Sequence, residues 1–98
     1  LANALMIDTV LDWNFEAVPG KFDELAHAAA VSGGGKAFVP WLKRLKTEIG
    51  ITGGLIERGV TSAHLPRLVA LAAKDFAGAT NPRPAGEADY ERLFKAAM

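Results

Sequence analysis

Cysteine is absent from this 98-residue chain, and so is an excess of either charge. Without thiols the chain has no disulfide scaffold, no cysteine-ligated zinc, no iron-sulfur cluster and no thiol nucleophile. Lys and Arg together number 11 and Asp and Glu together number 11, so the formal net charge is zero. A neutral chain has no broad positive surface for nucleic acid or for an anionic membrane.

Long apolar runs are also missing. A bilayer span needs about 20 apolar residues, whereas the apolar start of the chain is interrupted by Asn3 and Asp8. Together with the lack of cysteine, this favours a cytoplasmic protein that binds neither nucleic acid nor membrane.

Aromatic residues are few, at 8%, and no segment alternates with a period of two for long enough to predict a strand. Half of the residues are apolar, and alanine is abundant, which suits closely packed helices. A chain of this length forms a single core at most. We therefore expect an all-α fold of about five helices in one compact domain, covering residues 1–98.

Apolar periodicity and breaker residues give the expected helices. The first runs over residues 2–14 and is apolar nearly all round. The second carries Phe22, Leu25, Ala26 and Ala29 on its apolar face and ends near residue 31. The third, with Pro40 in its opening turn, is expected to end at Gly50 and to point Lys43, Arg44 and Lys46 outward. Its predicted apolar face consists of Phe38, Leu42, Leu45 and Ile49.

Thr61 or Ser62 can cap a fourth helix, which is expected to end near Gly78. The segment Thr80-Asn81-Pro82-Arg83-Pro84 then forms a stiff corner, because proline fixes its own φ and keeps the preceding residue extended. Glu87 and Asp89 place negative charge at the start of a fifth helix, where the helix dipole favours it. The apolar face of that helix consists of Tyr90, Leu93, Phe94 and Ala97.

Three features suggest chemistry and are better explained structurally. Residues 32–37 read Ser-Gly-Gly-Gly-Lys-Ala, but a phosphate loop would need a glycine at Ala30 and a hydroxyl at Ala37. His27 and His64 have no partner at metal-ligand spacing, so both are expected to be surface or boundary residues. Asp8 and Asp12 lie one helical turn apart, which is more typical of a solvated or interface stripe than of an acid-base pair.

Two segments resemble the C-terminal part of the iron-containing, or group III, alcohol dehydrogenases. One is Ala2-Asn3-Ala4-Leu5 with Val10 and Asn14. The other begins with Gly59-Val60-Thr61 and Leu65-Pro66 and continues through Asp75 to the corner Asn81-Pro82-Arg83-Pro84. The order and spacing of these motifs agree over nearly the whole chain. The chain departs from the family pattern at His64, where an acidic residue is common, and at Ile7-Asp8-Thr9, where many members have Leu-Pro-His.

The resemblance implies that residues 1–98 are the helical C-terminal part of a two-domain oxidoreductase. Its N-terminal domain would bind NAD or NADP. A divalent metal, Fe(II) or zinc, held by one aspartate and three histidines, would polarise the oxygen of a small alcohol or aldehyde during reversible hydride transfer. A homo-oligomer is compatible with the resemblance.

The last ligand histidine of the family would lie immediately before Leu1, so the resemblance assigns this chain no catalytic, cofactor-binding or metal-ligating residue. The isolated chain is then expected to be inactive. By position, the resemblance implies that Phe76, Ala77 and Asn81 are pocket-side residues. A stand-alone helical interaction or self-association module remains the alternative, because an exposed apolar helix face also serves that role.

Overall fold

The computed structural model describes residues 2–98, except for the side chains of Ala2, Phe76 and Ala77. Five α-helices and four short 3₁₀ segments follow one another in the chain, and no strand occurs among the described residues. The expected all-α fold with five helices is therefore confirmed. The chain divides into two structural units, Leu1–Thr52 and Gly53–Met98.

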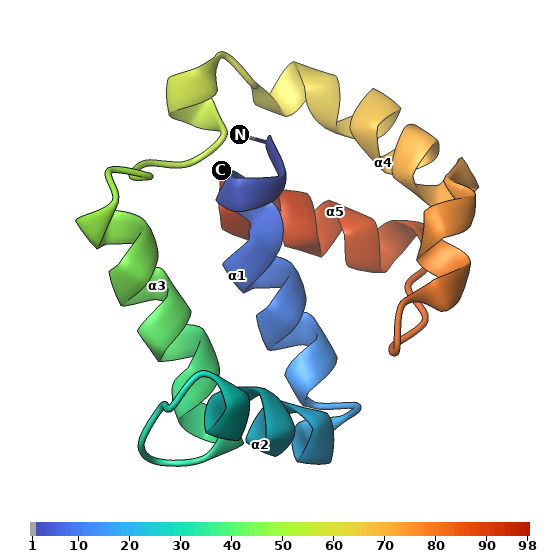
Figure 1. Ribbon diagram of the computed structural model, residues 1–98. Helices are drawn as coiled ribbons and strands as arrows, with labels where there is room; N and C mark the ends of the chain where they lie inside the picture. The colour runs from blue at the N-terminus through green and yellow to red at the C-terminus, as the bar shows by residue number, and fades with distance from the viewer. Residues whose placement is uncertain (1) are drawn as a thin grey trace. The chain divides into compact units, whose positions relative to one another are not determined.

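The first unit contains α1 (Ala2–Phe15), α2 (Pro19–Ala28), the 3₁₀ segment η1 (Gly35–Ala37) and α3 (Phe38–Glu48). Figure 1 shows α1 and α3 with α2 across their neighbouring ends. Pro19 and Pro40 both lie in the opening turn of a helix, where the missing N–H of proline costs no intrahelical hydrogen bond.

Aromatic rings join the three helices of the first unit. The ring centroid of Phe22 lies 5.3 Å from that of Phe15 on α1 and 6.1 Å from that of Phe38 on α3, both in edge-to-face geometry. Such edge-to-face pairs add about 0.5–1.5 kcal/mol each to the gain from burial. Phe22 and Ala26 on α2, Val39 on α3 and Leu5 on α1 are buried, so all three helices of this unit contribute buried apolar side chains.

One residue of the expected outward face of α3 points inward, and three residues of the expected apolar faces are exposed. Lys46 turns inward to α1, as described below, whereas Lys43 and Arg44 are exposed as expected. Ile49 is 63% exposed because it follows the last helical residue and no longer shares the buried face of the helix. Leu25 is 43% exposed, since Phe22 and Ala26 on the same helix occupy the buried stripe, and Ala29 is exposed because it follows the last residue of α2.

The second helix ends earlier than expected, at Ala28, because the chain reverses there. The N–H of Val31 donates to the carbonyl of Ala26 at 2.8 Å, and the N–H of Ala30 donates to that of His27 at 3.1 Å. This pair of hydrogen bonds is a Schellman motif, which places Ala30 in the left-handed region at φ 57°.

The glycine-rich segment is a loop between helices, as expected. The N–H of Gly35 donates to the Asp23 carboxylate at 2.7 Å, so the loop binds a side chain of its own unit. A Cβ atom at Gly35 would lie 2.8 Å from the backbone nitrogen of Asp23, which is too close. Glycine is therefore required at this position by the close approach to α2.

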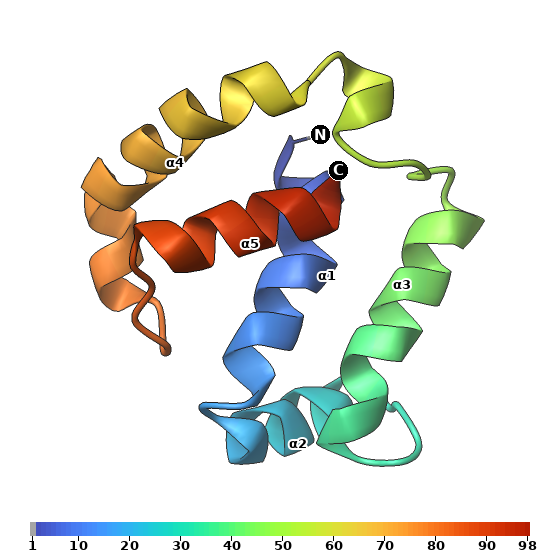
Figure 2. The same ribbon diagram turned by 180° about the vertical axis from the view of Figure 1, so that it is seen from behind.

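The second unit contains three 3₁₀ segments, η2 (Ile56–Arg58), η3 (Ser62–His64) and η4 (Phe76–Thr80), and the helices α4 (Leu65–Lys74) and α5 (Glu87–Ala97). In Figure 2, α4 and α5 are joined at one end through η4. Their packing forms the core of this unit. Its buried apolar residues are Leu55, Leu65, Val69 and Ala97.

The fourth helix also ends earlier than expected, at Lys74 and not near Gly78. Asp75 takes an extended conformation with ψ 119°, and the chain then continues as η4. The apolar periodicity continues through Phe76, and this continuity favoured a longer helix.

Candidate functional site

The corner between α4 and α5 contains the one predicted pocket-side residue whose side chain is described, Asn81. Its side-chain amide donates to the carbonyl of Arg83 at 2.7 Å, and its backbone N–H donates to the carbonyl of Gly78 at 3.2 Å. Asn81 is half-buried. These contacts give it a role in shaping the corner, because both bonds close turns within the segment. Phe76 and Ala77 are also predicted to be pocket-side residues, but their side chains lie outside the described part of the chain.

The segment η4 lies directly against α5 at Gly78. A Cβ atom at this position would approach the hydroxyl oxygen of Tyr90 to 2.8 Å. A larger residue would therefore require either the Tyr90 side chain or η4 to shift. Gly78 and Tyr90 are thus a close contact between η4 and α5.

His64 caps the start of α4 through the 3₁₀ segment before it. Its Nδ1 accepts a hydrogen bond from the backbone N–H of Thr61 at 2.9 Å. In a capping box, a carboxylate side chain normally accepts this hydrogen bond from the N-cap residue. His64 therefore replaces the acidic residue that is common at this position in the family pattern. The side chain is exposed, as expected, but its capping role is not visible in the sequence pattern.

Two carboxylates in the second unit, the half-buried Asp89 and the exposed Glu57, cap backbone amides. The N–H of Gly86 donates to Asp89 at 3.0 Å, and this hydrogen bond, with a smaller contribution from Arg92, lowers the pKa of the Asp89 carboxyl. The N–H of Gly54 likewise donates to Glu57 at 2.7 Å and lowers the pKa of that carboxyl. Both effects arise because the hydrogen bond favours the ionised form.

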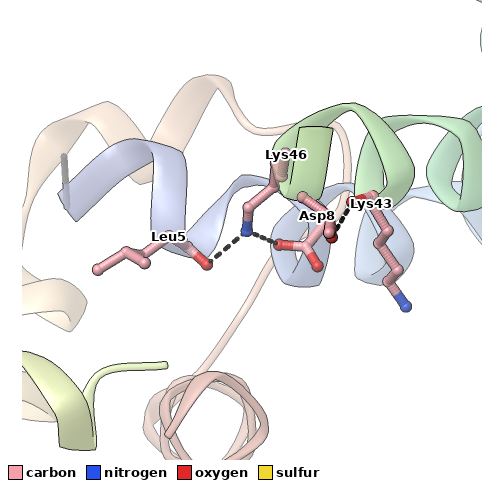
Figure 3. A network of polar contacts seen from close by, with 5 residues as sticks. Leu5, Asp8, Lys43 and Lys46 are labelled. Carbon is pink, nitrogen blue, oxygen red and sulfur yellow. Dashed lines mark hydrogen bonds and ion pairs between the residues drawn. The ribbon is translucent and has the colours of Figure 1, made fainter. Parts of the chain in front are cut away.

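Asp8 of the first unit is paired with a lysine and not with Asp12. The Nζ atom of Lys46 on α3 lies 2.8 Å from a carboxylate oxygen of Asp8 and donates to the carbonyl of Leu5 at 3.2 Å (Figure 3). The side chains of Lys46 and Asp8 are only 13% and 17% exposed, whereas Asp12 is exposed. Of the two expected stripe residues, Asp8 thus lies at a contact between α1 and α3, and Asp12 faces solvent.

Among the hollows of the second unit, two involve α4. One, of about 470 Å³, lies between α4 and α5 and is lined by Leu65, Val69, Glu87 and Glu91 among others. The other, of about 400 Å³, lies beside the start of α4. Asn81 lines neither of them.

Residues 1–98 match the model of the Fe-containing alcohol dehydrogenase family, C-terminal. The chain belongs to this family. The match covers the entire chain, so both structural units fall within the family's C-terminal region. Among curated protein sequences, no match was found.

A solved structure supports the same family. The chain is similar to 1,3-propanediol oxidoreductase, with a TM-score of 0.90 and 27% sequence identity over 98% of this chain. The chain covers 27% of that protein, about a quarter of its length. The resemblance to the iron-containing alcohol dehydrogenases is therefore confirmed, and the fold is that of the family's helical C-terminal domain.

The described residues do not include a set of ligands for the iron after which the family is named. No three His, Cys, Asp or Glu side chains gather there in a group that could hold a metal ion. His27 and His64 are exposed and lie in different units. The described residues of this chain thus do not fit a metal centre by themselves.

None of the described helices is both long enough and apolar enough to cross a membrane.

Proposed function

We propose that this chain is the helical C-terminal part of a two-domain, metal-dependent alcohol dehydrogenase that transfers hydride reversibly between an alcohol and NAD or NADP. The observation that supports this most is the family match over residues 1–98, together with the 27% share of the similar oxidoreductase that the chain covers. The match favours an enzyme part over a stand-alone interaction module.

The proposed partner is an N-terminal dinucleotide-binding domain, which supplies the NAD(P) site. The metal of the parent enzyme, Fe(II) or zinc, takes its ligands from residues outside this chain, in keeping with the lack of a ligand cluster among the described residues. The chain then forms part of the wall of the parent enzyme's active site and supports it, and the isolated chain is inactive. We place the enzyme in the cytoplasm, with a small alcohol or aldehyde as substrate and with homo-oligomer formation compatible with this role.

Asn81 is proposed to influence the substrate pocket of the parent enzyme by fixing the shape of the proline corner. Phe76 and Ala77 are proposed to face that substrate pocket. The two hydrogen bonds of Asn81 support this role, since they fix the loop that follows η4. A residue that positions a loop changes substrate binding more than the chemical step, so Asn81→Ala in the parent enzyme is expected to raise KM with a smaller change in kcat.

A direct assay tests the proposed division of labour. The isolated chain and the parent enzyme are each incubated with NAD or NADP, Fe(II) or zinc, and a panel of small alcohols, and the formation of reduced cofactor is followed. We expect turnover by the parent enzyme and none by the isolated chain, because the dinucleotide site and the metal ligands are assigned to the rest of the enzyme. Appreciable turnover by the isolated chain would refute this proposal.

A further inference from the structure

The hollow beside the start of α4 is lined by basic and apolar side chains. Its volume is about 400 Å³, within the range of small-molecule sites. We call it the arginine pocket. Its lining side chains are Arg58, Val60, His64, Arg67, Leu68 and Leu71.

The polar side chains of the arginine pocket are hydrogen-bond donors. Arginine is always charged and has no acceptor atom. His64 accepts the N–H of Thr61 at its Nδ1, so the neutral ring carries its proton on Nε2 and can donate from that atom. A neutral imidazole normally offers one acceptor, but in this histidine the capping bond already uses it. The pocket therefore offers side-chain donors with no matching side-chain acceptor.

The positive charge of the pocket is only partly balanced. Glu57 is the nearest acid to Arg58 in sequence, and Arg58 makes a small contribution to lowering its pKa. The Glu57 carboxylate, however, binds the N–H of Gly54. For Arg67, no ion pair or side-chain hydrogen bond occurs within the described part of the chain.

The remaining lining is apolar. Val60, Leu68 and Leu71 line the hollow together with the two arginines, and Leu71 is 57% exposed. A ligand that complements this surface has an oxyanion for the arginines and an apolar group for the leucines. Inorganic anions can bind the arginines but have no group for the leucines, and neutral alcohols have an apolar group but no oxyanion.

We propose that the arginine pocket binds a small amphipathic oxyanion, a carboxylate or a phosphate monoester that carries an apolar group of a few carbon atoms. This site is separate from the proposed dehydrogenase chemistry and requires neither metal nor dinucleotide. Carboxylate and phosphate share the chemistry that arginine recognises in a forked, two-bond geometry.

A titration of the full chain followed by ¹H–¹⁵N NMR tests this proposal. The probes are hexanoate and phenyl phosphate, with 1-hexanol and inorganic phosphate as the neutral and the purely ionic controls. We expect saturable shifts of amides in residues 58–71 with at least one amphipathic anion, at a Kd of about 1 mM, a value typical of weak small-ligand contacts. The two anion arms decide between carboxylate and phosphate. Equal affinity for hexanoate and 1-hexanol, or no saturation with either anion, would overturn the proposal.

Charge variants separate a local site from a general charge effect. Arg67→Gln is expected to weaken anion binding about fivefold, and the Arg58→Gln, Arg67→Gln double variant about tenfold or more, as for exposed charge-assisted hydrogen bonds. Arg44→Gln on the exposed face of α3 removes the same charge from the first unit and is expected to change the affinity less than about twofold. An equal loss in Arg44→Gln and Arg67→Gln would refute a local site.

Discussion

Lys46 shows how much the position of a single side chain depends on packing. Its ammonium group contacts the Asp8 carboxylate and the Leu5 carbonyl, and all three groups belong to the first unit (Figure 3). A half-buried carboxylate that loses its partner keeps the cost of desolvation, so the pair contributes more than a surface ion pair does.

Replacing this lysine tests the contact. Lys46→Met keeps most of the length of the side chain and removes its charge, and it is expected to lower the free energy of unfolding by about 2 kcal/mol, between the values for exposed and buried pairs. Urea denaturation measures the loss. Lys43→Met on the exposed face of the same helix is the control and is expected to change the stability by less than about 0.5 kcal/mol. Equal effects of the two substitutions would show that the contact with Asp8 adds nothing.

The sequence pattern could not reveal the roles of Lys46 and His64. Helical periodicity places Lys46 among charged neighbours, and only the packing of α3 on α1 brings Asp8 within its reach. His64 has the position of a capping carboxylate, but histidine rarely signals a cap in a sequence. In contrast, the amide of Asn81 closes a turn at the corner that the two prolines already indicated.

At the scale of elements, α2 and α3 end in the same motif with different residues. Both helices close with paired hydrogen bonds of the Schellman type, but the left-handed position is Ala30 after α2 and Gly50 after α3. A side chain in the left-handed region costs about 1 kcal/mol, which glycine avoids. No atom lies within 4 Å of a Cβ built at Gly50, so the difference at that position is purely conformational.

Exchanging the residues of these two motifs should shift stability in opposite directions. Ala30→Gly is expected to raise the free energy of unfolding by about 0.5 kcal/mol, because the removed strain exceeds the added entropy of the unfolded chain. Gly50→Ala is expected to lower it by about 1 kcal/mol. Denaturant midpoints measure both changes. A loss of stability in Ala30→Gly would contradict the assigned strain.

The cap of α5 should make stability depend on pH. The pKa of Asp89 in the folded chain is lowered by the Gly86 N–H, compared with about 3.9 in an unfolded chain. The stabilisation is therefore present above pH 4 and is lost as the pH falls through the folded pKa. Asp89→Ala is expected to lower the thermal midpoint at pH 7, with a difference from the parent chain that shrinks toward pH 2.

Glu87→Ala is the matched control for this cap. It removes the same charge from the same helical turn and leaves the hydrogen bond from Gly86 to Asp89 in place. Thermal scans at several pH values should show a smaller loss at pH 7 for this variant. A loss for Asp89→Ala that does not change with pH would contradict the role of the ionised carboxylate.

The existence of all five helices followed from periodicity, but two of their ends did not. Ala28 and Lys74 end their helices because a left-handed residue and an extended residue follow, at Ala30 and Asp75. Neither alanine nor aspartate is a strong stop signal, and apolar residues continue beyond both points. Gly50, which is a strong signal, follows the third helix as expected.

For the whole molecule, the family membership rests on motifs spread along the chain and not on any reactive group. The two units, Leu1–Thr52 and Gly53–Met98, contribute ion pairs, caps and a proline corner, whereas the described side chains form no metal cluster. These motifs were visible in the sequence because helix starts and corners need particular residues. The reactive groups of the proposed enzyme could not be predicted from this sequence, since we assign them to a different part of the protein.

The coding sequence upstream of Leu1 tests the central proposal most directly. If the chain is the C-terminal part of a two-domain dehydrogenase, sequencing will find the reading frame open, with a histidine codon directly before Leu1 and a glycine-rich dinucleotide-binding loop further upstream. A start codon close to Leu1, with no dinucleotide-binding domain before it, would contradict the account.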